Sequence, residues 1–230
     1  MLLLGIDTSG KTASAALFDT ENEVFLAQST IYTMKTHSQV IMPLCMEIIR
    51  QADKKISDIN VIAAANGPGS YTGLRIGAAA VKAMCFGLGI NCCGVSTLEG
   101  IAYNNLQFHG NICSLIKARG ELVYSCVYRS DGHRLEPICE EKLIELSEVS
   151  AFLESLDERT LLCGDGAADF FNDFRSDRFS LAPALSRLQN AAGICLAASM
   201  KEAVPPDELE VSYLQKVKAE KDLEEKNAQI

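Results

Sequence analysis

The chain has 230 residues, of which 48% are hydrophobic, and its formal net charge is −9. This length provides enough apolar residues for the core of one large domain or of two small lobes. Because nucleic acid repels a net anion that lacks a local basic patch or a basic partner, direct and unaided nucleic-acid binding is not expected. No apolar run reaches the roughly 18 residues that a membrane-spanning helix needs, so the sequence predicts none.

The cysteines and the N-terminal residues bear on the compartment. None of the nine cysteines falls in a Cys-x-x-Cys pair, and most lie inside apolar runs, where cysteine acts as a small hydrophobe. Such thiols indicate a reducing cytoplasm. The neighbours Cys92 and Cys93 are interpreted as core residues of one strand rather than as a redox pair. Residues 1–6 are apolar but have no basic leader and run into Asp7, which indicates a strand and not a signal peptide.

In chain order, the first half predicts three strands, then a helix, a strand, a helix, a strand and a helix. Pro43 falls near the first turn of the first helix, where proline is tolerated, and Thr36 or Ser38 is expected to cap that helix. The expected strands are 2–7, 13–18, 24–28, 60–65 and 90–95, and the expected helices are 38–52, 73–87 and 96–106.

The stretch 66–77 joins the strand at 60–65 to the helix at 73–87. Its two glycines, Gly67 and Gly69, flank a proline and force a turn, and Ser70 and Thr72 are each expected to cap the helix. A strand, a glycine turn and a helix N-terminus together suit either an anion or a tightly packed neighbour. The Walker pattern fails because no lysine begins the helix, and the dinucleotide pattern lacks its third glycine, so the spacing favours a turn that packs closely.

Two of the predicted helices are apolar on more than one side. In helix 38–52 one face carries Ile41, Leu44, Cys45 and Ile48, and a second stripe carries Met42, Met46 and Ile49. Helix 73–87 is apolar except for Arg75 and Lys82, and its glycines Gly73 and Gly77 would let another helix approach. Each large apolar side chain left in water forfeits about 1.5–3 kcal/mol of burial, so the second stripes should be covered. The cover is either the same chain or a helix of another subunit.

The second half of the chain repeats the plan of the first. Two copies of one strand and helix order predict an α/β, two-lobed actin-like fold (ASKHA, RNase-H-like) with a duplicated βββαβαβα plan. The expected lobes are residues 1–106 and 107–214, followed by a charged tail at 215–230. The expected strands of the second half are 111–118, 121–128, 135–142, 161–163 and 179–181, and the helices are 147–156, 167–174 and 186–203.

Several motifs resemble those of the TsaB (YeaZ) family, and the resemblance covers most of residues 1–214. The most specific is the glycine stretch, in which eleven consecutive residues fit. The motifs are Gly67-Pro68-Gly69-Ser70-Tyr71-Thr72-Gly73-Leu74-Arg75-Ile76-Gly77, Ile6-Asp7-Thr8-Ser9 with Ala15-Ala16-Leu17, Thr36-His37-Ser38 with Pro43, Gly94-Val95-Ser96-Thr97-Leu98, and Ala118-Arg119-Gly120-Glu121-Leu122-Val123-Tyr124.

The resemblance implies a cytoplasmic, non-catalytic assembly subunit of the bacterial tRNA threonylcarbamoyladenosine (t6A) transferase complex. Its implied partners are the catalytic paralogue TsaD, which holds the metal, and the ATPase TsaE, with tRNA bound only within the complex. The family also forms homodimers through the helices that it offers to TsaD, which favours an interface reading of the second stripes. The predicted interface residues are Ile41, Met42, Cys45, Met46, Ile49, Gly73, Ile76, Gly77, Ala80 and Met84.

Two enzymatic alternatives rest on other residues. A metallopeptidase would need the His-x-x-x-His pair of the catalytic relative, but His37 is followed four residues later by Ile41, while His109 and His133 are isolated in predicted loops. No catalytic, metal-binding or cofactor-binding residue is therefore assigned, and nucleotide is expected only at a joint interface with partners.

An ATP-binding phosphotransferase or ATPase is the stronger alternative, because several polar residues lie where actin-like folds touch phosphate and adenosine. Two departures from the family pattern, at Lys117 and at Gln215 after Tyr213-Leu214, weaken it. The residues concerned are Asp7, Thr8, Ser9, Arg119 and Gly164-Asp165-Gly166.

Overall fold

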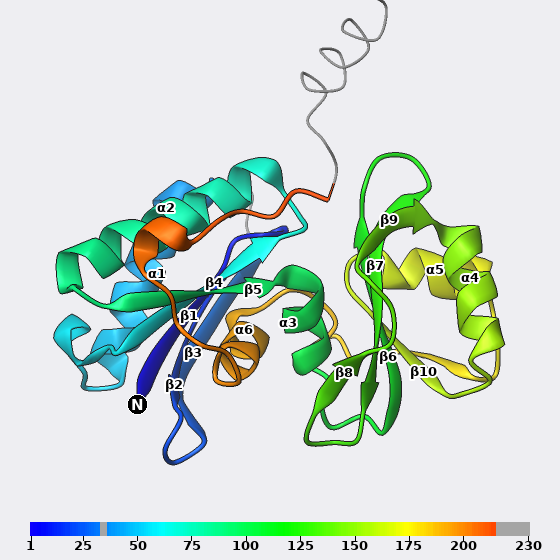
Figure 1. Ribbon diagram of the computed structural model, residues 1–230, viewed down its shortest axis with the longest axis horizontal. Coiled ribbons are helices and arrows are strands. Elements are labelled where there is room, and N and C mark those ends of the chain that lie inside the picture. Colours follow the sequence, from blue (N-terminus) through cyan, green and yellow to red (C-terminus); the bar gives the residue numbers. More distant parts are fainter. Residues whose placement is uncertain (33–35, 215–230) are drawn as a thin grey trace, which may run out of the picture.

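The computed structural model describes residues 1–32 and 36–214, which form two lobes, each built on one sheet (Figure 1). The first sheet has the strand order β3-β2-β1-β4-β5. β1 pairs antiparallel with β2 and parallel with β4, so the chain crosses over through a helix after β3. The elements of this half are β1 (Leu2–Asp7), β2 (Thr12–Asp19), β3 (Val24–Tyr32), α1 (His37–Gln51), η1 (Ile56–Asp58), β4 (Val61–Gly67), α2 (Tyr71–Leu88), β5 (Asn91–Ser96) and α3 (Thr97–Tyr103).

The second sheet repeats the first, with the order β11-β10-β6-β7-β8, and β9 also pairs with β7. The predicted two-lobed, duplicated actin-like plan is therefore confirmed. The elements of this half are β6 (Gly110–Lys117), β7 (Leu122–Ser130), β8 (Leu135–Pro137), β9 (Lys142–Glu145), α4 (Leu146–Ser155), β10 (Thr160–Cys163), α5 (Ala167–Asp173), β11 (Phe179–Leu181), α6 (Ala191–Ala198) and η2 (Pro206–Glu208).

Some element bounds differ from the sequence prediction. The single strand expected at 135–142 is two strands, β8 and β9, which pair with opposite ends of β7. Residues 138–141 lie between them outside any strand. The helix expected at 186–203 is limited to α6, and β3 continues to Tyr32. Pro43 lies inside α1 rather than in its first turn.

Helices lie on both faces of the first sheet. α1 and α2 pack on one face over Ile41, Cys45 and Val81, and α6 packs on the other through Ile194 and Cys195. α3 packs against both sheets, so it joins the lobes (Figure 1). In the second lobe, α4 and α5 cover the face of the sheet that is turned away from α3.

The predicted division at residue 107 is wrong for the end of the chain. α6 packs on β1 and β2, and the segment after it stays with the first lobe. Val204 forms a β-bridge with Cys92, and Ser212 N donates to Asn66 O at 2.7 Å. The chain thus returns to the first lobe because α6 is apolar nearly all round and requires cover on every side.

Two further expectations concern the charged tail and membrane-spanning helices. The predicted charged tail at 215–230 lies outside the described residues. Of the helices within residues 1–32 and 36–214, none combines the length and the apolar character that crossing a bilayer requires.

Candidate functional site

The glycine stretch turns β4 into α2 against the loop that follows β1. Ser70 is the N-cap of α2, and its Oγ accepts from Gly73 N at 3.2 Å, as the sequence predicts. Ser70 N also donates to Ser9 O at 2.7 Å. Thr72 does not cap the helix, because it is already the second helical residue. Thr36 is the N-cap residue of α1, but its side chain makes no capping hydrogen bond.

Gly73 and Gly77 of α2 leave room for Thr8, in the loop that follows β1 of the same chain. A Cβ on Gly73 would overlap the carbonyl oxygen of Thr8, and a Cβ on Gly77 would lie 2.5 Å from Thr8 Oγ1. Thr8 Oγ1 in turn donates to Gly73 O at 2.7 Å. The expectation that Gly73 and Gly77 admit a helix of another subunit is therefore wrong, since Thr8 already occupies that space.

Asp7 ends β1 beneath this contact and is fully buried. Its Oδ1 accepts from Ser9 Oγ at 2.6 Å and from Ser9 N at 2.9 Å. Burial raises the pKa of Asp7 from 3.8 to about 6, and the two hydrogen bonds from Ser9 oppose that rise. Asp7 therefore braces the loop after β1, whose residues Ser9 and Gly10 line a cavity between the lobes.

The cleft holds a cavity of about 380 Å³ that is lined from both lobes. It brings together Ser9, Arg119 and Asp165, three of the residues expected where actin-like folds touch nucleotide. Asp165 Oδ1 accepts from Lys117 N at 2.8 Å, and burial raises the pKa of Asp165. The Lys117 ammonium pairs with Asp169, so this base is already engaged.

Gln189 is a cleft residue that the sequence reasoning missed. It is 2% exposed, lines the cleft cavity and the adjoining one, and its Nε2 has no hydrogen-bond partner. It lies in the loop before α6, where no motif marks it. Only the return of α6 to the first lobe places Gln189 against Gly10.

His109 lies against Gly132, the residue before His133, whereas His37 belongs to the first lobe. His37 begins α1 and is half-buried, whereas His109 and His133 are exposed in loops, as expected. Burial lowers the pKa of His37. Within the part of the chain that the structure describes, no group of three or more His, Cys, Asp or Glu side chains is placed to hold a metal ion.

The predicted interface divides into a buried and an accessible part. Residues Ile41, Cys45 and Ile49 are spaced four apart, so they share one face of α1 and all belong to the core. The second stripe of α1 is thus reduced to two exposed methionines. The buried residues of the predicted set are Ile41, Cys45, Ile49, Gly73, Gly77 and Met84, and the exposed or half-buried ones are Met42, Met46, Ile76 and Ala80.

The accessible residues continue along α2 at helical spacing. Ala79, Ala83 and Phe86 are exposed and extend the row that begins at Ile76. α1 and α2 pack beside each other on the same face of the first sheet (Figure 1). We call this surface the outer face; it comprises Met42, Met46, Ile76, Ala79, Ala80, Ala83 and Phe86.

Comparison with known proteins identifies the family. The family model described as "TsaD: tRNA N6-adenosine threonylcarbamoyltransferase" matches residues 27–223. The tRNA threonylcarbamoyladenosine biosynthesis protein TsaB of Bacillus subtilis is 29% identical over 223 residues, which cover 96% of each chain. The chain belongs to the TsaD family and, within it, to the TsaB (YeaZ) group. TsaB of Escherichia coli is 32% identical over 133 residues, 57% of this chain and 56% of that protein.

Solved structures support the same fold. A Pseudomonas aeruginosa protein with similarity to peptidase YEAZ has a TM-score of 0.81 at 22% identity, covering 93% of this chain and 99% of its own. YeaZ from Pseudomonas aeruginosa gives 0.76 at 21% identity with the same coverage. At these identities the likeness concerns the fold alone.

Proposed function

We propose that this TsaB-family chain is a non-catalytic assembly subunit of tRNA threonylcarbamoyladenosine biosynthesis. It binds a TsaD-type threonylcarbamoyltransferase, its paralogue, through the outer face of α1 and α2. The observation that carries this proposal is an apolar surface on a pair of long helices that the described part of the chain leaves open. The TsaB and TsaD names of the matching relatives and family model supply the pathway.

The composition of the outer face suits helix-on-helix docking. Met46 is 47% exposed and Phe86 is 64% exposed, although burying such side chains is worth about 1.5–3 kcal/mol each. Ala79 and Ala83 have small side chains, which allow a partner helix to approach the backbone of α2 closely. Methionine adapts to the shape of a partner, which makes it common at binding surfaces.

The non-catalytic part of the proposal is supported by α1. The residue four positions after His37 is Ile41, which is buried in the core and cannot bind a metal ion. The transfer reaction is therefore assigned to the paralogue rather than to this chain. The present chain contributes structure, by holding its partner in the assembled state.

The remaining partners follow from the same assignment. We infer that the ATPase TsaE joins the complex, that tRNA binds only there, and that the chain alone forms a homodimer through the outer face. The nine free cysteines, eight of them buried, support a cytoplasmic location.

The cleft favours a second candidate, an ATP-binding phosphotransferase or ATPase. Its cavity is lined by Lys11 and Arg119, and the unpartnered Gln189 Nε2 is a free donor. Isothermal titration with ATP and magnesium separates the two candidates. Micromolar binding by the isolated chain would favour the enzyme, whereas binding that needs the paralogue would fit nucleotide at a joint interface.

Size-exclusion chromatography of this chain mixed with the paralogue tests the leading proposal. The parent should co-elute with it, and Met46→Glu should abolish co-elution because a charge would be buried in an apolar contact. Met200→Glu is the matched control, since Met200 is also exposed but lies beyond α6. Absence of a complex with the parent, or an equal effect of both substitutions, would refute the assigned surface.

A further inference from the structure

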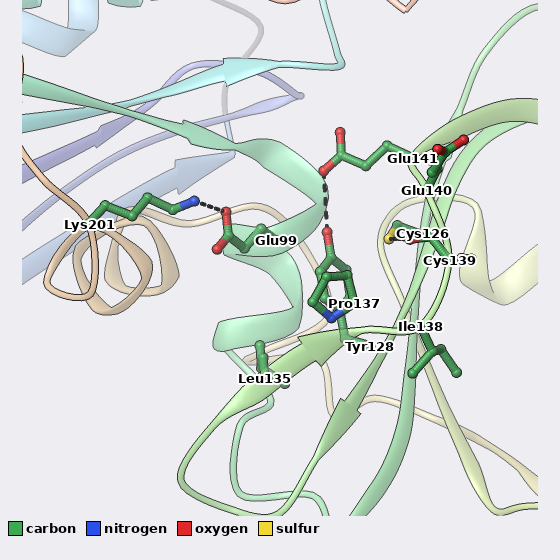
Figure 2. A pocket seen from close by; sticks show the side chains of 10 residues that line it. All are labelled: Glu99, Cys126, Tyr128, Leu135, Pro137, Ile138, Cys139, Glu140, Glu141 and Lys201. Atoms are coloured by element: carbon green, nitrogen blue, oxygen red, sulfur yellow. Dashed lines mark hydrogen bonds and ion pairs between the residues drawn. The ribbon is translucent and has the colours of Figure 1, made fainter.

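A larger cavity, about 640 Å³ in volume, lies at the junction of the lobes (Figure 2). The first lobe lines it with Glu99 of α3 and with Lys201, which form an ion pair at 2.9 Å. The second lobe lines it with β7, β8 and residues 138–141, where Tyr128 Oη donates to Glu141 Oε1 at 3.3 Å. This cavity is separate from the cleft and from the outer face.

Two cysteines lie opposite each other on the wall of this cavity. Tyr128 pairs with Pro137, and Ile138 N donates to Val127 O at 2.9 Å, so the chain that leaves β8 runs beside β7 and brings Cys139 next to Cys126. Cys126 Sγ donates to Cys139 O at 3.3 Å. Figure 2 shows both side chains on the same side of the cavity.

The two thiols differ in access. Of the nine cysteines, Cys139 is the one that is not buried. Cys126, a residue of β7, also lines the cavity but is only 1% exposed and packs against α3 in the core. A small molecule in the cavity therefore meets the more exposed Cys139 first, with the buried Cys126 next to it.

The surroundings of Cys139 favour its thiolate. Val127 N donates to Cys139 Sγ at 3.2 Å, which stabilises a negative sulfur. The neighbouring Cys126 side chain lowers the pKa of Cys139 most, and the Val127 N–H and Lys142 act in the same direction, against burial and Glu141. The contact with Cys139, together with burial, raises the pKa of Cys126. Thiolate is the reactive form in thiol–disulfide exchange.

We propose that Cys139 is a site of reversible modification by low-molecular-weight disulfides, and that Cys126 resolves the adduct to an intramolecular disulfide. The oxidant is a small disulfide such as glutathione disulfide. This inference is independent of the function proposed above, because none of its residues belongs to the outer face.

The exchange has two balanced steps. The Cys139 thiolate attacks one sulfur of the small disulfide, forms a mixed disulfide and releases one thiolate, which takes up a proton. The Cys126 sulfur then attacks Cys139 Sγ and gives up its proton as the new S–S bond forms, and the departing small thiolate takes up a proton and leaves as the second thiol. Overall both protein thiols are oxidised and one small disulfide is reduced to two thiols.

The backbone geometry permits the second step. Cys126 Sγ lies 3.3 Å from Cys139 O, and Cys139 Sγ lies 3.2 Å from Val127 N, the residue after Cys126. A disulfide needs Cβ atoms about 3.5–4.5 Å apart, so closure requires a local movement of the two side chains and of the chain that carries Cys139. Residues 138–141 can supply it because they lie between strands rather than inside one.

Intact mass and peptide mapping of the full chain after exposure to glutathione disulfide test the proposal. The parent should lose two hydrogens in mass and yield a crosslink between the peptides of Cys126 and Cys139. Cys126→Ser should stop at one glutathione adduct on Cys139, and Cys139→Ser should give neither product. Cys93→Ser, a buried thiol on β5, is the matched control and should behave as the parent.

A second readout needs no substitution at the pair. The rate of Cys139 alkylation by iodoacetamide, followed by peptide mapping of the parent, should reach half its maximum well below the ordinary cysteine pKa of about 8.5. A midpoint at or above that value, an adduct first formed at another cysteine, or a Cys126→Ser variant that yields the parent products would each overturn the proposal.

Discussion

The two lobes have the same order of strands, yet the helix pairs that cover one face of each sheet differ in length. α1 and α2 have 15 and 18 residues, whereas the corresponding α4 and α5 have 10 and 7. The exposed large apolar residues differ in the same way. α1 and α2 expose Met42, Met46, Tyr71 and Phe86, while α4 and α5, both within the described residues, expose none. The duplication thus extends to the scaffold but not to the surface available for recognition.

The turns beside the cleft are what the lobes share. In the first lobe, Gly73 leaves room for the carbonyl oxygen of Thr8, and in the second Gly164 leaves room for that of Leu115. Each glycine lies beside the chain near the end of a central strand, β1 or β6. Both lobes therefore require a close backbone contact near the end of the central strand. The outer face, in contrast, is present in the first lobe only.

The largest expected effect tests the shared turns. Gly73→Ala and Gly164→Ala should each lower the free energy of unfolding by about 3 kcal/mol or more, because the new methyl group would overlap a backbone oxygen that cannot rotate away. Gly164 also has a φ of +96°, which an alanine adopts only with strain. Urea denaturation followed by circular dichroism measures the change.

Gly87→Ala is the matched control for these two variants. Gly87 lies in the same helix as Gly73, but a Cβ there would meet nothing within 4 Å. Alanine should stabilise that position by about 0.5–1 kcal/mol through its better helix propensity. Equal stability of Gly73→Ala and Gly87→Ala would show that the contact with Thr8 is not tight.

The next prediction tests the difference between the lobes. Ala83→Glu on α2 should weaken binding of the TsaD-type paralogue about 30-fold or more, since an interface residue of importance contributes about 2 kcal/mol. Ala151→Glu makes the same substitution on exposed α4 and should leave the affinity unchanged. Titration by isothermal calorimetry gives both values. Equal weakening would move the binding surface away from the outer face.

The same contrast explains how far the sequence could predict the fold. Apolar periodicity predicted the order of strands and helices in both lobes, except that it merged β8 and β9 into one strand, because each element buries one face locally. The return of α6 to the first lobe was missed, although its nearly uniform apolar composition is the signal of a helix covered on all sides. Chain continuity alone assigned it to the second lobe.

The site was predicted less completely than the fold. Helical spacing grouped Ile49 with Met42 and Met46, but Ile49 also lies four residues after Cys45, and the wider core-facing side of α1 includes it. The glycines of α2 were correctly taken as a sign of close packing. Their neighbour, Thr8, was not identifiable because the contact joins residues 65 positions apart.

The third prediction concerns the buried carboxyl of the first lobe. The pKa of Asp7 is about 6 in the folded chain against an ordinary 3.8, so the folded state holds this proton more tightly than the unfolded state. Its contribution to stability is therefore present below about pH 4 and is lost as pH rises to about 6. Asp7→Asn removes the charge and keeps an acceptor for Ser9.

The variant should accordingly be more stable than the parent by up to about 3 kcal/mol at about pH 7.5, and the difference should shrink towards about pH 4. Denaturation of both proteins at the two pH values measures it. If Asp7→Asn were less stable at neutral pH, the carboxylate charge would have a favourable partner in the cleft, which would strengthen the nucleotide-binding alternative.

The smallest expected effect concerns the N-terminal caps of α2 and α5, the helices that follow these turns. Ser70 Oγ caps α2 by accepting from Gly73 N, whereas the N-cap of α5 is Gly166, which has no side chain to do so. Ser70→Ala should cost about 1 kcal/mol. Ser147→Ala in the first turn of α4 is the control, because Ser147 Oγ bonds the Glu145 carboxylate and not a backbone N–H. If the two variants lost the same stability, the long α2 would depend on its packing against Thr8 rather than on its cap.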